Sequence, residues 1–232
     1  MRLKDKVAIV SGASRGIGRA IALRFVQEGA RVVAFARGDF PHAKSAEHET
    51  GTSFTYARGD VAAREDCERI VSQTVALHGK IDILVNAAGF LGMRTGLVDI
   101  TVDDWDKVFA TNARGTFLLS KLVVAEMLRR GSGSIINVTS GVVSRPGPNW
   151  GAYLPSKYAI EGMTLMLSEE LKESGIRVNM VDPGRTDTDM IKDAYPDIDT
   201  HKLKKPDEVA GAFVYLASDE SKLITGTRIR FK

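Results

Sequence analysis

The sequence predicts a three-layer α/β fold, in which helices cover both faces of a doubly wound, parallel sheet of about seven strands. Short β-branched runs bounded by Gly, Asp or Pro alternate with longer stretches whose apolar residues recur at helical spacing. The runs 8–10 and 83–85 are apolar at every position, which is typical of parallel strands buried on both faces. Alternating strands and helices indicate a parallel sheet, because parallel strands are joined by crossover connections that are usually helices.

The expected strands share apolar or β-branched residues and end at residues that form turns. In chain order they are Val7–Ser11, Arg31–Ala36, Ser53–Ala57, Ile83–Asn86, Gly133–Thr139, Arg177–Val181 and Thr227–Phe231. Between the second and third strands, Gly38–Gly51 has weak periodicity, so we expect a loop there.

The expected helices have apolar residues every three or four positions. They are Gly16–Gln27, Ala63–His78, Val102–Leu128, Tyr153–Ser174 and Pro206–Ser218. Thr101 followed by Asp104 resembles a capping box and marks the start of the third helix. Pro155 is compatible with the fourth, because the first turn of a helix needs no N–H group from it.

The composition fits a single globular domain over residues 1–232. With 32 Lys and Arg against 29 Asp and Glu, the net charge is only +3, too small for the basic stripe of a nucleic-acid-binding protein. No apolar stretch is long enough for a signal peptide or a membrane span, so we expect a cytoplasmic protein. Cys67 has no nearby ligand spacing, so we expect a reduced structural thiol and no metal site.

A glycine-rich turn between the first strand and the first helix predicts a dinucleotide-binding sheet of the Rossmann type. Backbone without side chains can approach a pyrophosphate there, and the N–H groups and dipole of the helix favour an anion. The spacing differs from the common G-x-G-x-x-G fingerprint. The candidate cofactor contacts in this turn are Gly12, Ser14, Arg15, Gly16, Ile17 and Gly18.

The residue after the second strand favours NADP(H) over NAD(H). Sites for NAD usually place an acid there, whereas this chain has Arg37, which could pair with a 2′-phosphate together with Arg15. The alternative is that both arginines are merely solvated and Asp39 contacts the ribose. After the third strand, Asp60 could face the adenine amino group beside Val61, or it could simply cap a helix.

Five separated motifs agree in order and spacing with one family. They are the three glycines of the turn, Asn86-Ala87-Ala88-Gly89, Asn112, Ser140 with Tyr153-Leu154-Pro155-Ser156-Lys157, and Pro183-Gly184 followed by Thr188. From about Lys6 to Gly226 the chain resembles the compact, single-domain branch of the short-chain dehydrogenase/reductase family. Within this family, the sequence most resembles 3-oxoacyl-thioester reductases and similar carbonyl reductases.

The resemblance implies a catalytic set of Asn112, Ser140, Tyr153 and Lys157. Because Tyr153 and Lys157 are four residues apart, a helix places them on one face, where the ammonium should lower the pKa of the phenol. By resemblance, Ser140 binds the substrate oxygen, Asn112 orders a water that relays protons, and Lys157 also holds the nicotinamide ribose. On its own, Y-x-x-x-K is often an accidental pair on a helix surface.

The family also implies cofactor contacts after the fourth and sixth strands. Small residues after the fourth would let the backbone run beside the cofactor ribose, and the turn after the sixth would hold the nicotinamide carboxamide. With the catalytic pair Tyr153 and Lys157, the implied contacts are Asn86, Ala87, Gly89, Pro183, Gly184, Thr186 and Thr188.

Three loops, 90–98, 141–150 and 185–205, are expected to enclose a mainly apolar substrate pocket. Its candidate substrate contacts are Ser140, Val142, Trp150, Tyr153 and Met190, with Leu91 and Tyr195 as further lining. Arg94 and Arg145 could pair with a substrate carboxylate or phosphate, although loop arginines are more often solvated.

Two features depart from the family pattern. The stretch 184–206 is short for a substrate lid, and the chain ends without the Val-Asp-Gly-Gly tail of many relatives. In the last strand, alternation turns Ile229 and Phe231 toward the core, and Arg228, Arg230 and Lys232 outward, as in an edge strand. The resemblance still implies a homotetramer or homodimer that packs the helices of Asn112 and Tyr153 against their copies.

These observations favour an NADPH-dependent oxidoreductase that reduces a ketone or 3-oxoacyl carbonyl to a secondary alcohol, reversibly. One alternative is an NAD-linked polyol or secondary-alcohol dehydrogenase, which the Arg37 position disfavours. Another is a non-catalytic, dinucleotide-binding regulatory protein, which the intact catalytic set disfavours.

Overall fold

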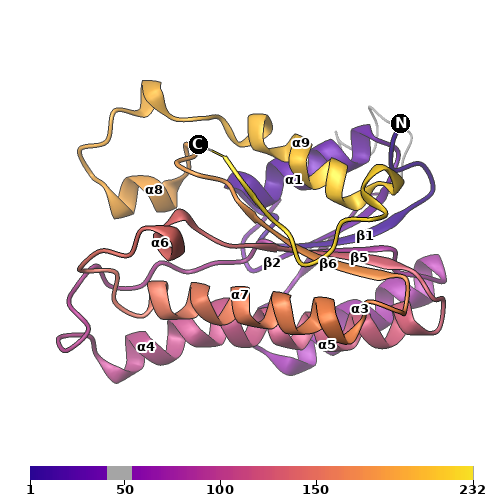
Figure 1. Ribbon diagram of the computed structural model, residues 1–232, viewed down its shortest axis with the longest axis horizontal. Coiled ribbons are helices and arrows are strands. Elements are labelled where there is room, and N and C mark those ends of the chain that lie inside the picture. Colours follow the sequence, from indigo (N-terminus) through magenta and orange to yellow (C-terminus); the bar gives the residue numbers. More distant parts are fainter. Residues whose placement is uncertain (41–53, 232) are drawn as a thin grey trace.

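The computed structural model describes residues 1–40 and 54–231, which form a seven-stranded parallel sheet between two layers of helices (Figure 1). The order of strands across the sheet is β3-β2-β1-β4-β5-β6-β7. The strands are β1 Val7–Ser11, β2 Arg31–Ala36, β3 Phe54–Arg58, β4 Ile83–Asn86, β5 Gly133–Val138, β6 Ile176–Asp182 and β7 Arg228–Arg230. The predicted three-layer α/β fold is confirmed, with no strand limit that differs from the prediction by more than one residue.

The longer helices are α1 Gly16–Gln27, α3 Arg64–His78, α4 Val102–Phe109, α5 Gly115–Leu128, α7 Tyr153–Glu170 and α9 Pro206–Ala217. Helices α1 and α9 cover one face of the sheet, and α3, α5 and α7 cover the other, as Figure 1 shows. Two short helices, α6 Gly141–Ser144 and α8 Asp189–Ala194, lie in the segments expected as substrate loops. Helix α7 ends four residues before the predicted limit.

The sheet has a separate apolar core on each face. Ala8 and Val10 of β1 pack with Phe25 of α1 and Phe213 of α9, all fully buried. Ile9 points to the other face and packs among residues of α3 and α5 such as Leu119. Successive residues of the central strands therefore point to opposite faces of the sheet and contribute to both cores. This explains why these strands are apolar at every position.

The predicted continuous helix Val102–Leu128 is interrupted by one π-helical turn, Ala110–Arg114. The turn contains the fully buried Asn112. A π turn inserts one extra residue into the helix and is frequent at functional sites. Sequence spacing cannot show such an insertion, because the apolar positions on either side keep their helical intervals.

The last strand is shorter than predicted, and the expected orientation of Arg228 is wrong. Ile229 and Phe231 do pack partly buried against the core, and Arg230 is exposed, as alternation predicts. Arg228, however, is mostly buried and forms ion pairs with Glu161 and Asp182. The buried carboxylate of Asp182 at the end of β6 explains this, because it needs a counter-charge. Lys232 lies outside the described residues.

Three smaller expectations concern Cys67, the loop Gly38–Gly51 and membrane association. The Cys67 thiol is buried and donates to the Val61 carbonyl, and burial raises its pKa to about 12, which makes it an inert thiol. Residues 41–51 of the expected loop are outside the described part of the chain. None of the helices in the described part is both long and apolar enough to cross a membrane.

Candidate active site

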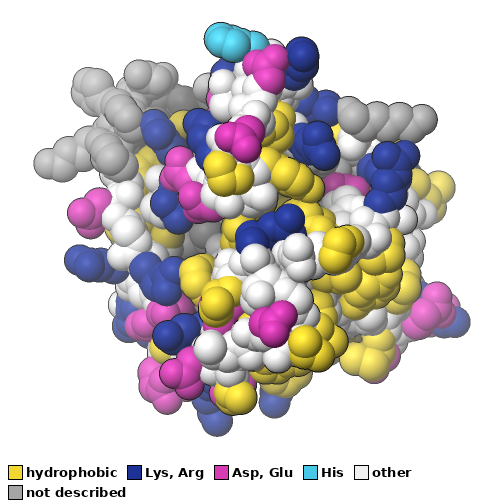
Figure 2. Space-filling view, turned by 90° about the vertical axis from the view of Figure 1, so that its left-hand side faces the viewer, with side chains coloured by type: hydrophobic (Ala, Val, Ile, Leu, Met, Phe, Trp, Pro, Cys, Tyr) yellow, Lys and Arg dark blue, Asp and Glu magenta, His cyan; other side chains and the backbone are white. Residues whose placement is uncertain are grey.

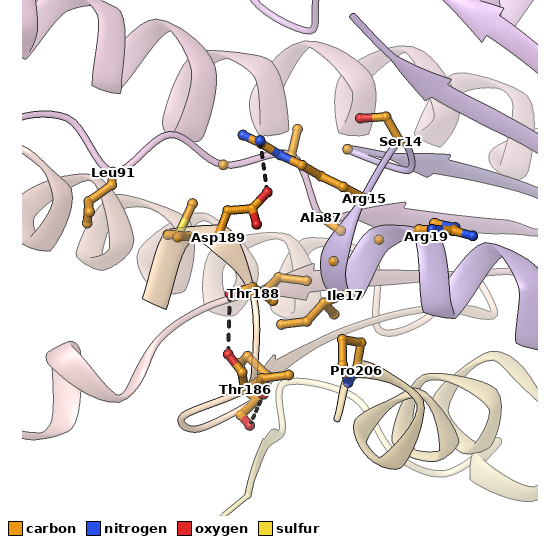
Figure 3. Close-up of a pocket in the computed structure, with 18 of the residues that line it drawn as sticks. Ser14, Arg15, Ile17, Arg19, Ala87, Leu91, Thr186, Thr188, Asp189 and Pro206 are labelled. Atoms are coloured by element: carbon orange, nitrogen blue, oxygen red, sulfur yellow. Dashed lines mark hydrogen bonds and ion pairs between the residues drawn. The ribbon is translucent and has the colours of Figure 1, made fainter. Parts of the chain in front are cut away.

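A cavity of about 940 Å³ lies at the carboxyl ends of the strands. It begins at the switch point between β1 and β4, where the strand order reverses, and continues past β5 and β6 to α8. Open parallel sheets bind ligands at this position. Figure 3 shows part of its lining, where Arg15 of the glycine turn reaches toward Asp189 and Ile17 lies beside Thr188.

The glycine turn brings the backbone of β1 and β4 into contact. Gly12 has a φ of +66°, and a Cβ atom there would lie 2.6 Å from the backbone nitrogen of Ala88. Ser11 holds the same junction, since its hydroxyl accepts the N–H groups of Ala87 and Ala88 at 3.1 and 3.2 Å. No side chain caps helix α1, so its first N–H groups are available to an anion in the cavity. These residues fit a dinucleotide pyrophosphate.

Arg37 follows β2 at one end of the cavity, Arg15 lies in the glycine turn, and each faces a carboxylate. Arg15 forms an ion pair of 3.0 Å with Asp189 at the start of α8, and Arg37 lies 3.7 Å from Asp60. All four side chains are well exposed, so these pairs are weak and exchangeable. Asp60 also accepts the N–H group of Ala62 at 2.9 Å in the turn before α3. The N-cap of α3 is Ala63, without a side-chain cap, so the alternative that Asp60 caps this helix is wrong.

Helix α7 places Tyr153 and Lys157 on the cavity wall. The Lys157 nitrogen lies 5.4 Å from the centre of the Tyr153 ring and donates to the Val138 carbonyl at 2.9 Å. Burial lowers the pKa of Lys157 to about 8, opposed by the charge of Glu161. Burial raises the pKa of Tyr153 to about 12, and Asp182 adds to the increase, while a hydrogen bond with Ser140 opposes it.

The direction of the Tyr153 shift is therefore opposite to the sequence expectation. The cost of removing the phenolate from water exceeds the stabilisation that the hydrogen bond with Ser140 gives it. The phenol stays protonated at neutral pH, which is the state that can donate a proton to a carbonyl oxygen.

Asn112 lies beside the cavity without lining it, and protein groups use both ends of its amide. Its nitrogen donates to the Phe90 carbonyl at 3.0 Å and to the Ser156 hydroxyl at 2.9 Å, and its oxygen accepts the Phe90 N–H at 2.7 Å. Asn112 thus ties the loop after β4 to α7. It makes no direct hydrogen bond to Tyr153 or Lys157, so the proton path expected through it is not formed by side chains alone.

A buried ionic network that sequence reasoning missed lies behind the catalytic residues. Asp182 accepts the Gly184 N–H at 3.0 Å and pairs with Arg228 at 3.0 Å, and Arg228 also donates to the Ser140 carbonyl at 2.9 Å. Arg228 further pairs with Glu161 at 3.3 Å. The network therefore connects the ends of β5 and β6, which carry Ser140 and the Pro183–Gly184 turn.

Most candidate residues line this one cavity. Those that do are Gly12, Ser14, Arg15, Gly16, Ile17, Gly18, Arg37, Asp60, Val61, Ala87, Gly89, Ser140, Trp150, Tyr153, Lys157, Pro183, Gly184, Thr186, Thr188 and Met190. Asn86 does not, because its side chain is buried and donates to Asn137 and Ser120. Val142 is buried in an apolar cluster with Tyr153. Thr188 caps α8 and faces the glycine turn, since a Cβ on Gly16 would lie 3.2 Å from its methyl group.

The part of the cavity beside Tyr153 is apolar and aromatic. Leu91, Trp150 and Met190 line it, and the Trp150 ring centre lies 5.8 Å from that of Tyr153. Tyr195 packs edge-on against Trp150 at 5.9 Å. Within residues 1–40 and 54–231, no group of three or more His, Cys, Asp or Glu side chains could hold a metal ion.

Comparison with known proteins gives consistent matches. Residues 6–199 match the family model described as short chain dehydrogenase. The chain is 38% identical to a 3-oxoacyl-(acyl-carrier-protein) reductase of Thermotoga maritima, covering 97% of this chain and 96% of that protein. It is 37% identical to dehydrogenase/reductase SDR family member 4 of Bos taurus, covering 98% and 86%. A Shigella flexneri short chain dehydrogenase solved as a complex with NADP superposes with a TM-score of 0.93 at 31% identity, covering 99% and 98%.

Proposed function

Because this chain belongs to the short-chain dehydrogenase/reductase family, we propose that it uses NADPH to reduce a ketone or 3-oxoacyl carbonyl to a secondary alcohol. The proposed reaction is reversible. The Thermotoga relative is named for a 3-oxoacyl reduction, and two solved neighbours are complexes with NADP or NADPH. The observation that carries the proposal is the position of Tyr153 beside Ser140 and Lys157 in the described cavity.

Different residues of the cavity would bind the cofactor, bind the carbonyl substrate and transfer the proton. The glycine turn and the start of α1 would hold the pyrophosphate, and Lys157 and the Pro183–Gly184 turn would hold the nicotinamide end. When bound, the cofactor supplies the hydride. Ser140 binds the carbonyl oxygen and Tyr153 gives it a proton. The nearby Lys157 ammonium stabilises the phenolate that remains.

The preference for NADPH rests on charges at the end of β2. The strand ends in Ala36 and is followed by Arg37, so a guanidinium takes the position that usually carries an acid in NAD sites. Arg15 and Arg37 could exchange their exposed partners Asp189 and Asp60 for the phosphate. This arrangement disfavours the alternative of an NAD-linked dehydrogenase.

We also propose that one domain carries both sites, and that the enzyme acts in the cytoplasm as a homodimer or homotetramer. Helix α7 supports an oligomer, since Tyr158, Leu165 and Met166 are each about half exposed on it. A non-catalytic, dinucleotide-binding role is the contrasting candidate. A non-catalytic role would not explain why Tyr153 and Lys157 are buried side by side on the cavity wall.

Turnover of a panel of ketones with NADPH and with NADH tests the proposal. We expect kcat/KM with NADPH to exceed that with NADH by at least about tenfold, because paired guanidinium–phosphate contacts contribute more than 1.4 kcal/mol. A reversed preference would favour the NAD-linked alternative. Tight cofactor binding without turnover of any carbonyl would favour the non-catalytic role.

A further inference from the structure

Two arginines outside the catalytic set stack on the aromatic wall of the substrate pocket. The guanidinium carbon of Arg94 lies 3.8 Å from the ring centre of Trp150 and 5.7 Å from that of Tyr195. That of Arg185 lies 4.9 Å from the ring centre of Tyr195. Arg94 comes from the loop before α4 and Arg185 from the loop after β6, so two distant segments bring positive charge to the same rings.

The aromatic wall leads directly to the reacting phenol. The ring of Trp150 contacts that of Tyr153 at 5.8 Å and lines the cavity, so only one ring separates the Arg94 charge from the catalytic residue. Figure 2 views the end of the molecule that carries α6 and α8, and shows Lys and Arg side chains set directly beside hydrophobic ones. Arg94 and Arg185 therefore place two positive charges against the aromatic residues beside the pocket.

Among the described residues, neither arginine has an acidic partner. In the described part of the chain, no carboxylate lies within ion-pair distance of Arg94 or Arg185, whereas Arg15, Arg37 and Arg228 all face carboxylates. A guanidinium that stacks through its face keeps the N–H groups of its edge for other ligands. That edge matches a carboxylate or a phosphate with two parallel hydrogen bonds.

We propose that the carbonyl substrate carries an anionic group, a carboxylate or a phosphate, and that Arg94 binds it while Ser140 and Tyr153 hold the carbonyl oxygen. Arg185, on the neighbouring ring, adds to the positive field. This inference rests on the proposed reductase function and restricts its substrate class. A neutral, purely apolar ketone would leave both guanidinium edges without a ligand.

Matched pairs of carbonyl compounds test the proposal kinetically. The probes are 4-oxopentanoate, 5-oxohexanoate and 6-oxoheptanoate, each against its methyl ester, and dihydroxyacetone phosphate against dihydroxyacetone. We expect at least one anion to exceed its neutral partner in kcat/KM by about 10- to 100-fold, which corresponds to about 1.4 to 2.8 kcal/mol. The pair that shows the effect distinguishes a carboxylate from a phosphate.

Substitution of Arg94 should remove this preference while the ester is still reduced. Arg94→Met keeps apolar contact with Trp150 and loses the charge, and Arg94→Lys keeps the charge without the two-pronged edge. We expect Arg94→Met to raise KM for the anion to that for the ester, and Arg94→Lys to fall between. Arg130→Met is the matched control, because Arg130 is also exposed but lies before β5, at the opposite end of the sheet.

A binding measurement makes the result independent of turnover. The chain has two tryptophans, so in a Trp105→Phe background the fluorescence reports Trp150 alone. Titration with the oxoacids and with dihydroxyacetone phosphate should give, for at least one anion, a saturable change that its neutral partner does not give and that Arg94→Met abolishes. Equal responses within every pair, or an anion preference that survives in the Arg94→Met, Arg185→Met double variant, would overturn the proposal. Reduction of neutral ketones with NADPH in that case would leave the reductase function intact.

Discussion

At the scale of single residues, the protonation states of Tyr153 and Lys157 decide what the site can do. Burial raises the pKa of the phenol to about 12 and lowers that of the ammonium to about 8. At neutral pH the pair therefore holds a neutral acid next to a cation. This combination suits donation of a proton to a carbonyl oxygen better than its removal from an alcohol.

Tyr153→Phe should reduce kcat by roughly 10²–10⁴-fold, because general acid catalysis contributes about that much. The ring and its contact with Trp150 remain, so cofactor affinity should change little. Steady-state kinetics with a dinucleotide-binding titration measures both. Near-normal turnover in this variant would remove Tyr153 from the role of acid.

The pH dependence of reduction should follow Lys157. Its ammonium is lost as pH rises through about 8, so kcat/KM for NADPH should be level below this pH and decrease above it. Glu161 raises the pKa of Lys157, so Glu161→Gln should move the inflection to lower pH. The variant also removes the ion pair of Glu161 with Arg228, but Arg228 keeps its pair with Asp182. An unchanged or upward-shifted inflection would contradict this assignment.

At the scale of structural elements, Arg228 joins the short strand β7 to the two strands that carry the site. Arg228→Met should leave the buried Asp182 without its nearest counter-charge and the Ser140 carbonyl without its donor. We expect a loss of about 3 kcal/mol in the free energy of unfolding and a lower kcat. Urea unfolding and steady-state kinetics measure the two effects.

Arg230→Met is the matched control for this prediction. Arg230 lies 3.5 Å from the same carboxylate but is 39% exposed, so its removal should cost less than about 1 kcal/mol. If the two substitutions changed the free energy of unfolding and kcat equally, the buried position of Arg228 would have no particular effect on stability or activity. An Arg228→Lys variant should recover part of kcat if the charge beside Ser140 and Asp182 is what matters.

How much the sequence predicts differs between elements for physical reasons. The strands and the glycine turn are predictable because buried parallel strands and a close backbone approach restrict the residues at consecutive positions. The pairing of Arg228 with Asp182 is not, because the two are 46 residues apart and strand alternation turns Arg228 outward. The π turn at Asn112 and the raised pKa of Tyr153 also depend on burial, which no local pattern reports.

At the scale of the whole molecule, we expect the exposed face of α7 to be covered by a second copy. Tyr158, Leu165 and Met166 lie at helical spacing on it and are 49%, 50% and 56% exposed. Met166→Asp should shift the mass measured by light scattering toward the monomer without unfolding the chain, because the side chain makes no core contact. A monomeric wild type would refute the predicted oligomer.

The ion pair between Arg15 and Asp189 spans the mouth of the cavity and fastens α8 to the glycine turn (Figure 3). If a 2′-phosphate draws that guanidinium away, Asp189 loses its counter-charge and the fastening is released. The next residue, Met190, forms part of the wall around the carbonyl. Coenzyme with a 2′-phosphate would then leave Met190 freer to adjust around the carbonyl compound, whereas NADH, which has no 2′-phosphate, would leave the ion pair in place.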